Sequence, residues 1–108
     1  MLMIASGVLS ACGAKFSPSA WRSVNTGLNS RAAMAGDLIR TDRLKGLSRQ
    51  QVVSLLGEPN RPGYNYFPDS DLVYDLGPER GWMSIDDEWL LIDLDRNGRV
   101  SRAQIGRD

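Results

Sequence analysis

The stretch that decides the fold is residues 90–105, LLIDLDRNGRVSRAQI. Its Asn97-Gly98 dipeptide between two strand-like runs is typical of a β-hairpin with a two-residue turn of type I′. That turn sets a register in which the facing residues on one side are apolar or small. These facing pairs are Leu94 with Ser101, Ile92 with Ala103 and Leu90 with Ile105. On the other side Asp93 faces Arg102, an opposite-charge pair that favours antiparallel pairing.

Two helices are predicted upstream of this hairpin. Residues 49–56 follow Ser48, a good helix N-cap, and Gln51 stands three residues further on to complete a capping box. Gly57 is placed to end this helix in the left-handed conformation. Residues 30–43 carry apolar side chains at helical spacing and predict an earlier helix.

A further strand completes the predicted domain. Alternate residues of 72–76, LVYDL, share one face, and residues 88–95 form the strand that leads into the hairpin. We therefore expect an α+β domain over residues 30–108. In it, two N-terminal helices pack on one face of a three-stranded antiparallel β-meander.

The N-terminal segment, residues 1–12, is similar to an export signal. Residues 1–11 are uncharged and mostly apolar but too short to span a bilayer, and residues 9–12, LSAC, resemble the lipobox of bacterial lipoproteins. This resemblance implies cleavage before Cys12 and a lipid thioether on its sulfur, which would anchor the protein to the membrane. The basic residues that usually precede the apolar run are missing. Either the natural start lies upstream, or the match arises by chance and Cys12 is a buried free thiol.

Residues 13–29 are rich in Gly, Ser, Asn and Ala and show neither helical nor strand periodicity. We expect them to form a flexible tether between the lipid anchor and the domain. Phe16 and Trp21 are the aromatic residues of this segment. They would lie at the level of the lipid headgroups, and docking of Trp21 onto the domain is the alternative.

Two internal stretches resemble the SmpA/OmlA (BamE-like) family of outer-membrane assembly lipoproteins. Residues 44–59, LKGLSRQQVVSLLGEP, are similar to the family's capped helix ending in Leu-Gly-x-Pro, and residues 90–100, LLIDLDRNGRV, are similar to its strand and Asn-Gly turn. With the lipobox, the resemblance implies a lipid-anchored protein at the periplasmic face of the outer membrane. Its implied partners are envelope proteins, with the β-barrel assembly machinery among the candidates. Residues 74–88 depart from the family's usual strand connection by being longer.

Composition argues against catalysis. The chain has no His and a single Cys, which removes the commonest general base, the ordinary catalytic triad and Cys-based zinc sites. Its 13 basic residues balance its 13 acidic residues, so no net field draws the chain to nucleic acid. We expect no enzymatic activity, no cofactor and no nucleic-acid partner.

Two acidic stretches are candidates for cation binding. Residues 93–98, DLDRNG, match the first half of an EF-hand loop, but its twelfth position is Gln104, which has no carboxylate. Asp86, Asp87 and Glu88 have no oriented partner in the sequence, and an acidic strand entry that discourages edge pairing explains them equally well. No metal site is therefore predicted.

Aromatic residues mark the predicted partner-binding surface. Trp89 and Leu91 lie on the sheet face away from the predicted core, and Trp82 lies in the connection before them. Exposed Trp rings at a domain edge are side chains that interfaces prefer. With Asp86 and Asp87 at the rim, these residues form the predicted site. The alternative is that the tether or the loop of residues 60–67 covers Trp89 and Leu91 within the monomer.

The sequence thus predicts a non-catalytic, lipid-anchored periplasmic module that binds protein partners in outer-membrane and envelope assembly or integrity. The alternative is an inhibitor-like or small-ligand-binding lipoprotein of the same fold. A cavity between helix and sheet would favour the alternative, whereas an exposed aromatic face would favour protein binding.

Overall fold

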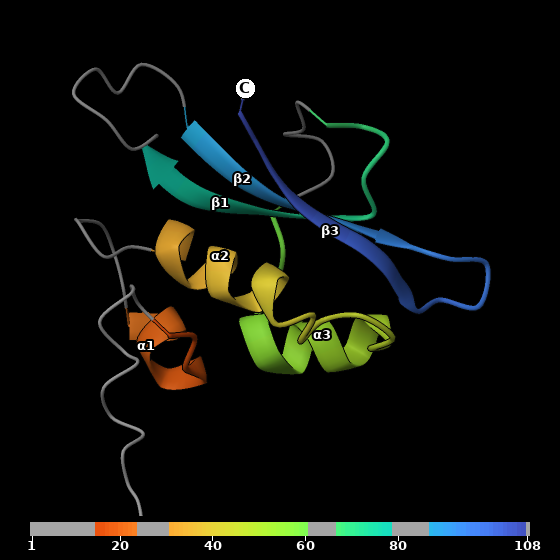
Figure 1. Ribbon diagram of the computed structural model, residues 1–108. Coiled ribbons are helices and arrows are strands. Elements are labelled where there is room, and N and C mark those ends of the chain that lie inside the picture. Colours follow the sequence, from red (N-terminus) through yellow and green to blue (C-terminus); the bar gives the residue numbers. More distant parts are fainter. Residues whose placement is uncertain (1–14, 24–30, 61–66, 79–86, 108) are drawn as a thin grey trace, which may run out of the picture.

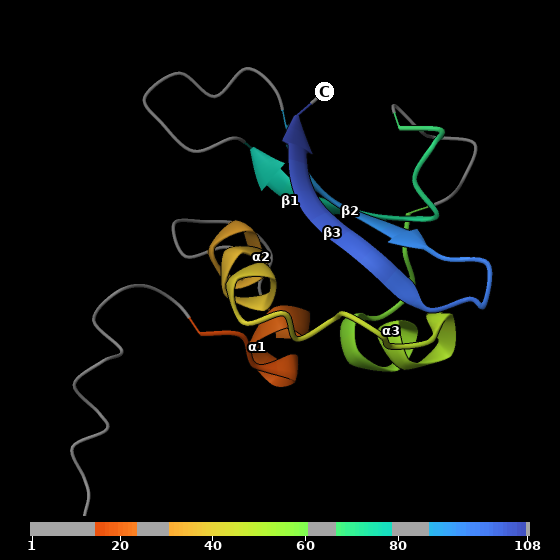
Figure 2. The same ribbon diagram turned by 45° about the vertical axis from the view of Figure 1, so that its right-hand side comes forward.

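The chain forms an α+β structure in which the helices lie on one side of an antiparallel sheet (Figures 1 and 2). The computed structural model describes residues 15–23, 31–60, 67–78 and 87–107. The elements are α1 (Pro18–Ser23), α2 (Arg31–Arg40), α3 (Arg49–Leu56), β1 (Leu72–Pro78), β2 (Asp87–Leu94) and β3 (Val100–Arg107). The strands follow each other in the order β1-β2-β3. The predicted α+β class and three-stranded antiparallel sheet are confirmed.

Helix α3 has the start that its sequence predicts. The Ser48 hydroxyl accepts a hydrogen bond from the backbone N–H of Gln51 (3.1 Å), and the Gln51 side chain accepts one from the backbone N–H of Ser48 (2.8 Å). At the other end Gly57 has φ 90° and ψ −175°. The positive φ requires glycine, but the ψ value is not that of the left-handed helical conformation we predicted.

Helix α2 is shorter than the predicted range 30–43. Asp42 has a positive φ of 54°, and its backbone N–H donates to the Ile39 carbonyl, while the N–H of Arg43 donates to the Leu38 carbonyl. This is the pattern of a Schellman motif, with Asp42 in the position that glycine usually takes. The motif ends the helix at Arg40, although the apolar spacing continues beyond it.

The loop between β2 and β3 is not the predicted turn. Gly98 has a positive φ of 78°, whereas Asn97 does not, and a type I′ turn needs positive φ at both. The backbone N–H of Asp95 donates to the Arg99 carbonyl (2.8 Å), and that of Gly98 donates to the Asp95 carbonyl (2.9 Å). The loop is therefore a three-residue connection that ends in glycine, the next most common hairpin type.

A bulge in β3 compensates for this longer loop. Leu94 faces Val100 and not Ser101, so that part of the predicted register is wrong. The register then shifts at the bulge, and Asp93 faces Arg102 as predicted, with 3.3 Å between the carboxylate and the guanidinium. The remaining predicted pairs, Ile92 with Ala103 and Leu90 with Ile105, are confirmed.

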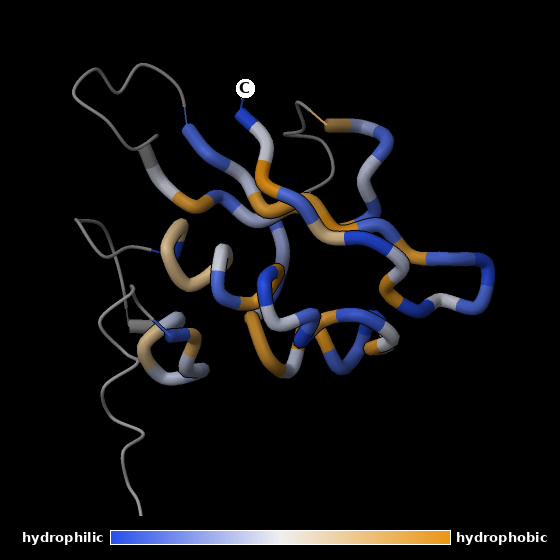
Figure 3. Tube along the Cα trace, in the orientation of Figure 1, coloured by the Kyte–Doolittle hydropathy of each residue, from blue (hydrophilic) through white to orange (hydrophobic). Residues whose placement is uncertain are grey.

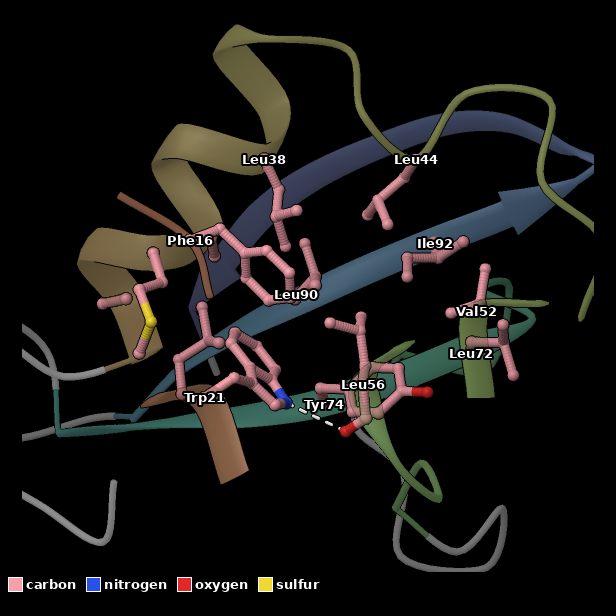
Figure 4. Close-up of a cluster of buried hydrophobic side chains, with 14 of the residues drawn as sticks. Phe16, Trp21, Leu38, Leu44, Val52, Leu56, Leu72, Tyr74, Leu90 and Ile92 are labelled. Carbon is pink, nitrogen blue, oxygen red and sulfur yellow. Dashed lines mark hydrogen bonds between the residues drawn. The ribbon is translucent and has the colours of Figure 1, made fainter. Parts of the chain in front are cut away.

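The segment before the predicted first helix is part of the folded domain. Helix α1 lies within residues 13–29, and Trp21 in it is completely buried. Its indole N–H donates to the Leu56 carbonyl at the end of α3 (2.9 Å), and its ring lies 6.0 Å from that of Phe16 (Figure 4). The predicted flexible tether is therefore wrong for residues 15–23, and the alternative of a docked Trp21 is observed. Residues 13, 14 and 24–30 lie outside the described residues.

The main core fills the space between the helices and the sheet. Figure 3 shows hydrophobic positions along α2, α3 and the strands, whereas the β2–β3 loop is hydrophilic. Leu72, Tyr74, Leu90 and Ile92 supply the sheet side of the core, and Leu38 supplies part of the helix side. Of the helices in the described part of the chain, none is both long and apolar enough to cross a membrane.

Candidate functional site

The outer face of the sheet, predicted as the partner surface, is covered. Trp89 is 1% exposed and Leu91 is 6% exposed, and with Val73 they form a second small core on the side away from the helices. Phe67 packs on this cluster, with its ring centroid 6.1 Å from that of Trp89. The prediction that Trp89 and Leu91 are exposed is therefore wrong. The alternative of coverage within the monomer is observed.

The chain that follows Phe67 is fixed to the sheet by hydrogen bonds. The backbone N–H of Asp71 donates to the Ile92 carbonyl (3.0 Å), and the Asp71 carboxylate accepts from the backbone N–H of Leu94 (2.7 Å). Gly106 faces Trp89 across the β2–β3 ladder, and a Cβ there would lie 2.8 Å from a methyl carbon of Leu91. The absence of a side chain at this position leaves room for the small core.

Of the remaining predicted partner-binding residues, Asp87 lies in the described part of the chain. Trp82 and Asp86 lie outside the described part of the chain, as do the loop residues Tyr64 and Tyr66 and the proposed lipid-attachment residue Cys12. Asp87 is half-buried on β2. Its neighbour Glu88 is 1% exposed, with its carboxylate 3.9 Å from the Arg107 guanidinium.

The carboxylates of the hairpin serve the turn and the ladder. One carboxylate oxygen of Asp95 accepts from the backbone N–H groups of Asn97 (2.8 Å) and Arg99 (3.1 Å), which stabilises the loop. Asp93 pairs with Arg102 across the strands. Within the described ranges, no three residues of metal-ligating type come together.

A cavity of about 220 Å³ lies between the end of α2, the turn after it and β3. Its apolar walls are Leu38, Ile39, Leu44, Val100 and Ala103. Its polar lining includes Asp42, Lys45, Ser101 and Arg102. A typical small-molecule site has a volume of roughly 300–1,000 Å³. This cavity is smaller, and its size suits one or two apolar side chains.

We compared the chain with protein-family models, curated proteins and solved structures. None of them matches it.

The edge of β3 beside the cavity is open along much of its length. Val100 at its start is paired on its outer side, because its N–H donates to the Leu47 carbonyl (2.8 Å) and its carbonyl accepts from the N–H of Gly46 (3.0 Å). From Ser101 to Gly106, no backbone hydrogen bond joins the outer side of β3 to another segment that the structure describes. Figure 2 shows β3 at the edge of the sheet.

The open edge of β3 and the cavity beside it were not among the sequence predictions. The sequence of β3 does indicate a space at the cavity, because Ala103 is a small residue on the inward face, where its neighbours on β2 are large. Arg102 and Lys45 are exposed charged residues at the cavity. The cavity itself depends on where α2 ends. The Schellman motif at Asp42 sets that end, and helical periodicity does not reveal it.

Tyr74 is a buried phenol that joins the sheet to α3. It is 2% exposed, and its hydroxyl donates to the Gly57 carbonyl (2.8 Å). Burial raises the pKa of Tyr74 to about 12, and the negative charge of Glu58 acts in the same direction. At neutral pH the phenol is therefore protonated and structural.

This raised pKa makes the free energy of unfolding fall at high pH. An unfolded tyrosine loses its proton near pH 10, whereas the folded Tyr74 keeps it to about pH 12. The stabilisation is complete below pH 10 and is lost as the pH rises from 10 to 12, by about 2–3 kcal/mol. Urea unfolding at pH 9 to 12 measures the loss. In Tyr74→Phe this part of the pH dependence should be absent, and an equal slope in both proteins would contradict the assignment.

Proposed function

We propose that the chain is a non-catalytic, lipid-anchored module that binds protein partners at the periplasmic face of the outer membrane. In this proposal Cys12 carries the lipid, and the domain acts in envelope assembly or integrity, as the resemblance to the SmpA/OmlA family suggests. The observation that carries the binding role is the open edge of β3 beside a cavity with both apolar and polar walls. Exposed strand edges are ready sites for pairing with another chain.

In this proposal the lipid anchor lies a few residues from the folded domain. Residues 15–23 pack into the core, and Phe16 is buried there with the Arg43 guanidinium 5.1 Å from its ring centre. The backbone N–H of Phe16 donates to the Asp37 carboxylate (2.9 Å). Only three residues then separate Cys12 from this fixed point. A lipid on Cys12 would hold the domain close to the membrane surface, because the chain from Cys12 to Phe16 spans at most about 14 Å.

The partner surface differs from the one that the sequence suggested. Trp89 and Leu91 hold the sheet and the Phe67 segment together, so a partner would meet them only after that segment moves. The β3 edge needs no such movement. We therefore place the binding surface there, over the cavity between α2 and β3.

A small-ligand site is the second candidate function. The cavity between helix and sheet is the feature that favours it. Its volume of about 220 Å³ is below the usual range for small-molecule sites, which makes protein binding the better-supported proposal.

The lipid anchor is tested by the intact mass of the protein in the membrane fraction. We expect a chain that begins at Cys12 and carries the mass of a diacylglycerol thioether and an acylated amino terminus. In Cys12→Ser we expect no cleavage and no added lipid mass, because the serine oxygen does not form the thioether. Ser10→Gly keeps a small residue before the cleavage site and should be processed normally. A wild-type chain without added lipid would overturn the anchor.

The binding role is tested by photo-crosslinking in cells. A photoreactive residue at Ser101, exposed beside the β3 edge, should yield protein adducts that the same residue at Gln50, exposed on α3, does not. Equal adducts at both positions would contradict the proposed surface. Failure of Ser101 to yield any protein adduct, together with binding of a small apolar dye that Ala103→Leu abolishes, would favour the small-ligand function.

A further inference from the structure

The two edges of the sheet are protected to different extents. At the β1 edge, the backbone N–H of Asn60 donates to the Val73 carbonyl (2.8 Å), and the Asn60 side chain accepts from the backbone N–H of Asp75 (2.9 Å). At the β3 edge, residues 46–48 pair with Arg99 and Val100, and this pairing does not continue beyond Val100. A strand that pairs beyond Val100 would continue the ladder that residues 46–48 begin.

The side chains on the helix-facing side of β3 determine which side chains an added strand could place there. Ala103 and Ile105 lie on the helix-facing side of β3, opposite Ile92 and Leu90, and both are only partly buried. The cavity lies beside Ala103. In an antiparallel neighbour, a residue beside Ala103 would direct its side chain to the same face, toward the cavity. The cavity, of about 220 Å³, has room for an apolar side chain of the size of Val or Leu.

The charged residues at the β3 edge indicate which kind of strand could pair with it. β3 and the residue before it contain Arg99, Arg102 and Arg107 and no acidic residue. Asp93 of β2 lies 3.3 Å from Arg102, and Glu88 of β2 lies 3.9 Å from Arg107, but the Arg102 side chain is still 65% exposed. At the cavity, Lys45 adds a further exposed cation, and Asp42 is an exposed carboxylate of the same lining. A second copy would place this basic strand against itself, and like charges on neighbouring strands are destabilising. Carboxylates alternating with apolar residues would complement both faces.

We propose that β3 binds an extended acidic peptide segment of a partner protein as a fourth, antiparallel strand. The main chain of the peptide pairs with residues 101–106, one apolar side chain enters the cavity beside Ala103, and Asp or Glu side chains lie on the outer face beside Arg102. This inference rests on the proposed protein-binding function and names the chemistry of the partner.

The test uses the full chain as purified and a fluorescent octapeptide of alternating Glu and Val. We expect saturable binding by fluorescence anisotropy, and slower hydrogen exchange of the amides of residues 101–106 when the peptide is bound. A peptide of alternating Lys and Val, and a Glu-Val peptide with proline at its centre, should each bind at least about tenfold more weakly. The first loses the charge complement and the second loses a main-chain donor.

Variants of the chain test each part of the site. Ala103→Leu places three extra carbon atoms at the cavity, where they would compete with the side chain of the peptide, and Lys45→Glu reverses a charge in the cavity lining. Each should weaken binding by about tenfold or more. Gln50→Glu, exposed on α3, adds the same kind of charge away from the edge and should leave binding unchanged. Because Ala103→Leu can disturb packing, urea unfolding must show that it is folded, and Lys45→Glu gives an independent reading.

Several results would overturn this inference. They include no binding of the Glu-Val peptide, equal binding of the Lys-Val peptide, and protection from exchange at another surface. Protection of residues 101–106 without peptide would also overturn it. Protection that rises with protein concentration would assign the edge to a second copy, and protection that disappears when residues 1–14 are removed would assign it to the chain's own N-terminal segment. In each case crosslinking at Ser101 and the mass of the lipidated chain still report separately on the proposed function.

Discussion

Replacement of Trp21 by alanine is expected to lower the free energy of unfolding by about 3–5 kcal/mol, the usual cost of removing a fully buried tryptophan. The ring is completely buried and makes an edge contact with Tyr74, with 6.3 Å between ring centroids. The Arg31 guanidinium lies 4.8 Å from its ring centre. Alanine would remove all of these contacts and leave the Leu56 carbonyl without the indole N–H. Domains of this size are stable by about 5–15 kcal/mol, so the loss would be large.

Urea unfolding followed by circular dichroism measures this effect. Trp21→Phe keeps most of the ring and loses the hydrogen bond to Leu56, so we expect a smaller loss, of about 1–2 kcal/mol. Lys15→Ala, at an exposed position of the same segment, should change stability by less than about 0.5 kcal/mol. If Trp21→Ala were as stable as the wild type, residues 15–23 would behave as the flexible tether predicted from composition, and the docked helix α1 would be wrong.

Local hydrogen bonds explain why α3 could be predicted well. The capping box joins Ser48 to Gln51, three residues apart, and both side chains are visible in the sequence. Helix α1 has six residues, too few for a periodic pattern, and it is stabilised by contacts with distant residues such as Leu56. Residues 13–29 were predicted to be a tether because they are rich in Gly, Ser, Asn and Ala.

The hairpin shows why a correct register can follow from an incorrect turn. The register was derived from the assumed turn, and the polarity and charge of the facing side chains agreed with it, as in Asp93 opposite Arg102. The backbone reaches it through a three-residue loop and a bulge near Leu94, which together replace the two-residue turn. The sequence indicates which side chains can face each other across two strands. It does not determine the turn, because Asn-Gly occurs in more than one type of hairpin loop.

The sequence of β2 itself indicated that the outer face of this strand is buried. Residues 89–92, WLLI, are apolar without alternation, a pattern that favours a strand buried on both faces. We predicted an exposed face because the sequence placed no helix on that side. In the described part of the chain, Phe67 packs on this face, and its partner cannot be identified from its neighbours in the sequence.

Replacement of Trp89 by alanine tests whether this residue is structural or belongs to an interface. The ring is 1% exposed and packs with Leu91, Val73 and Phe67, so we expect the free energy of unfolding of the full chain to fall by about 3–5 kcal/mol in urea. Phe67→Ala should cost less, because Phe67 is only partly buried. The two rings are neighbours, so the double variant should show a coupling of about 0.5–1.5 kcal/mol.

An interface residue would give the opposite result. If Trp89 were exposed for a partner, Trp89→Ala would change the stability of the isolated chain by less than about 0.5 kcal/mol while reducing partner adducts at Ser101. Asp69→Ala, exposed near Phe67, is the matched control and should affect neither measurement. A large loss of stability in Trp89→Ala would explain reduced partner capture by unfolding alone. Partner capture by the still-folded Lys45→Glu variant therefore separates binding at the β3 edge from the stability of the outer face.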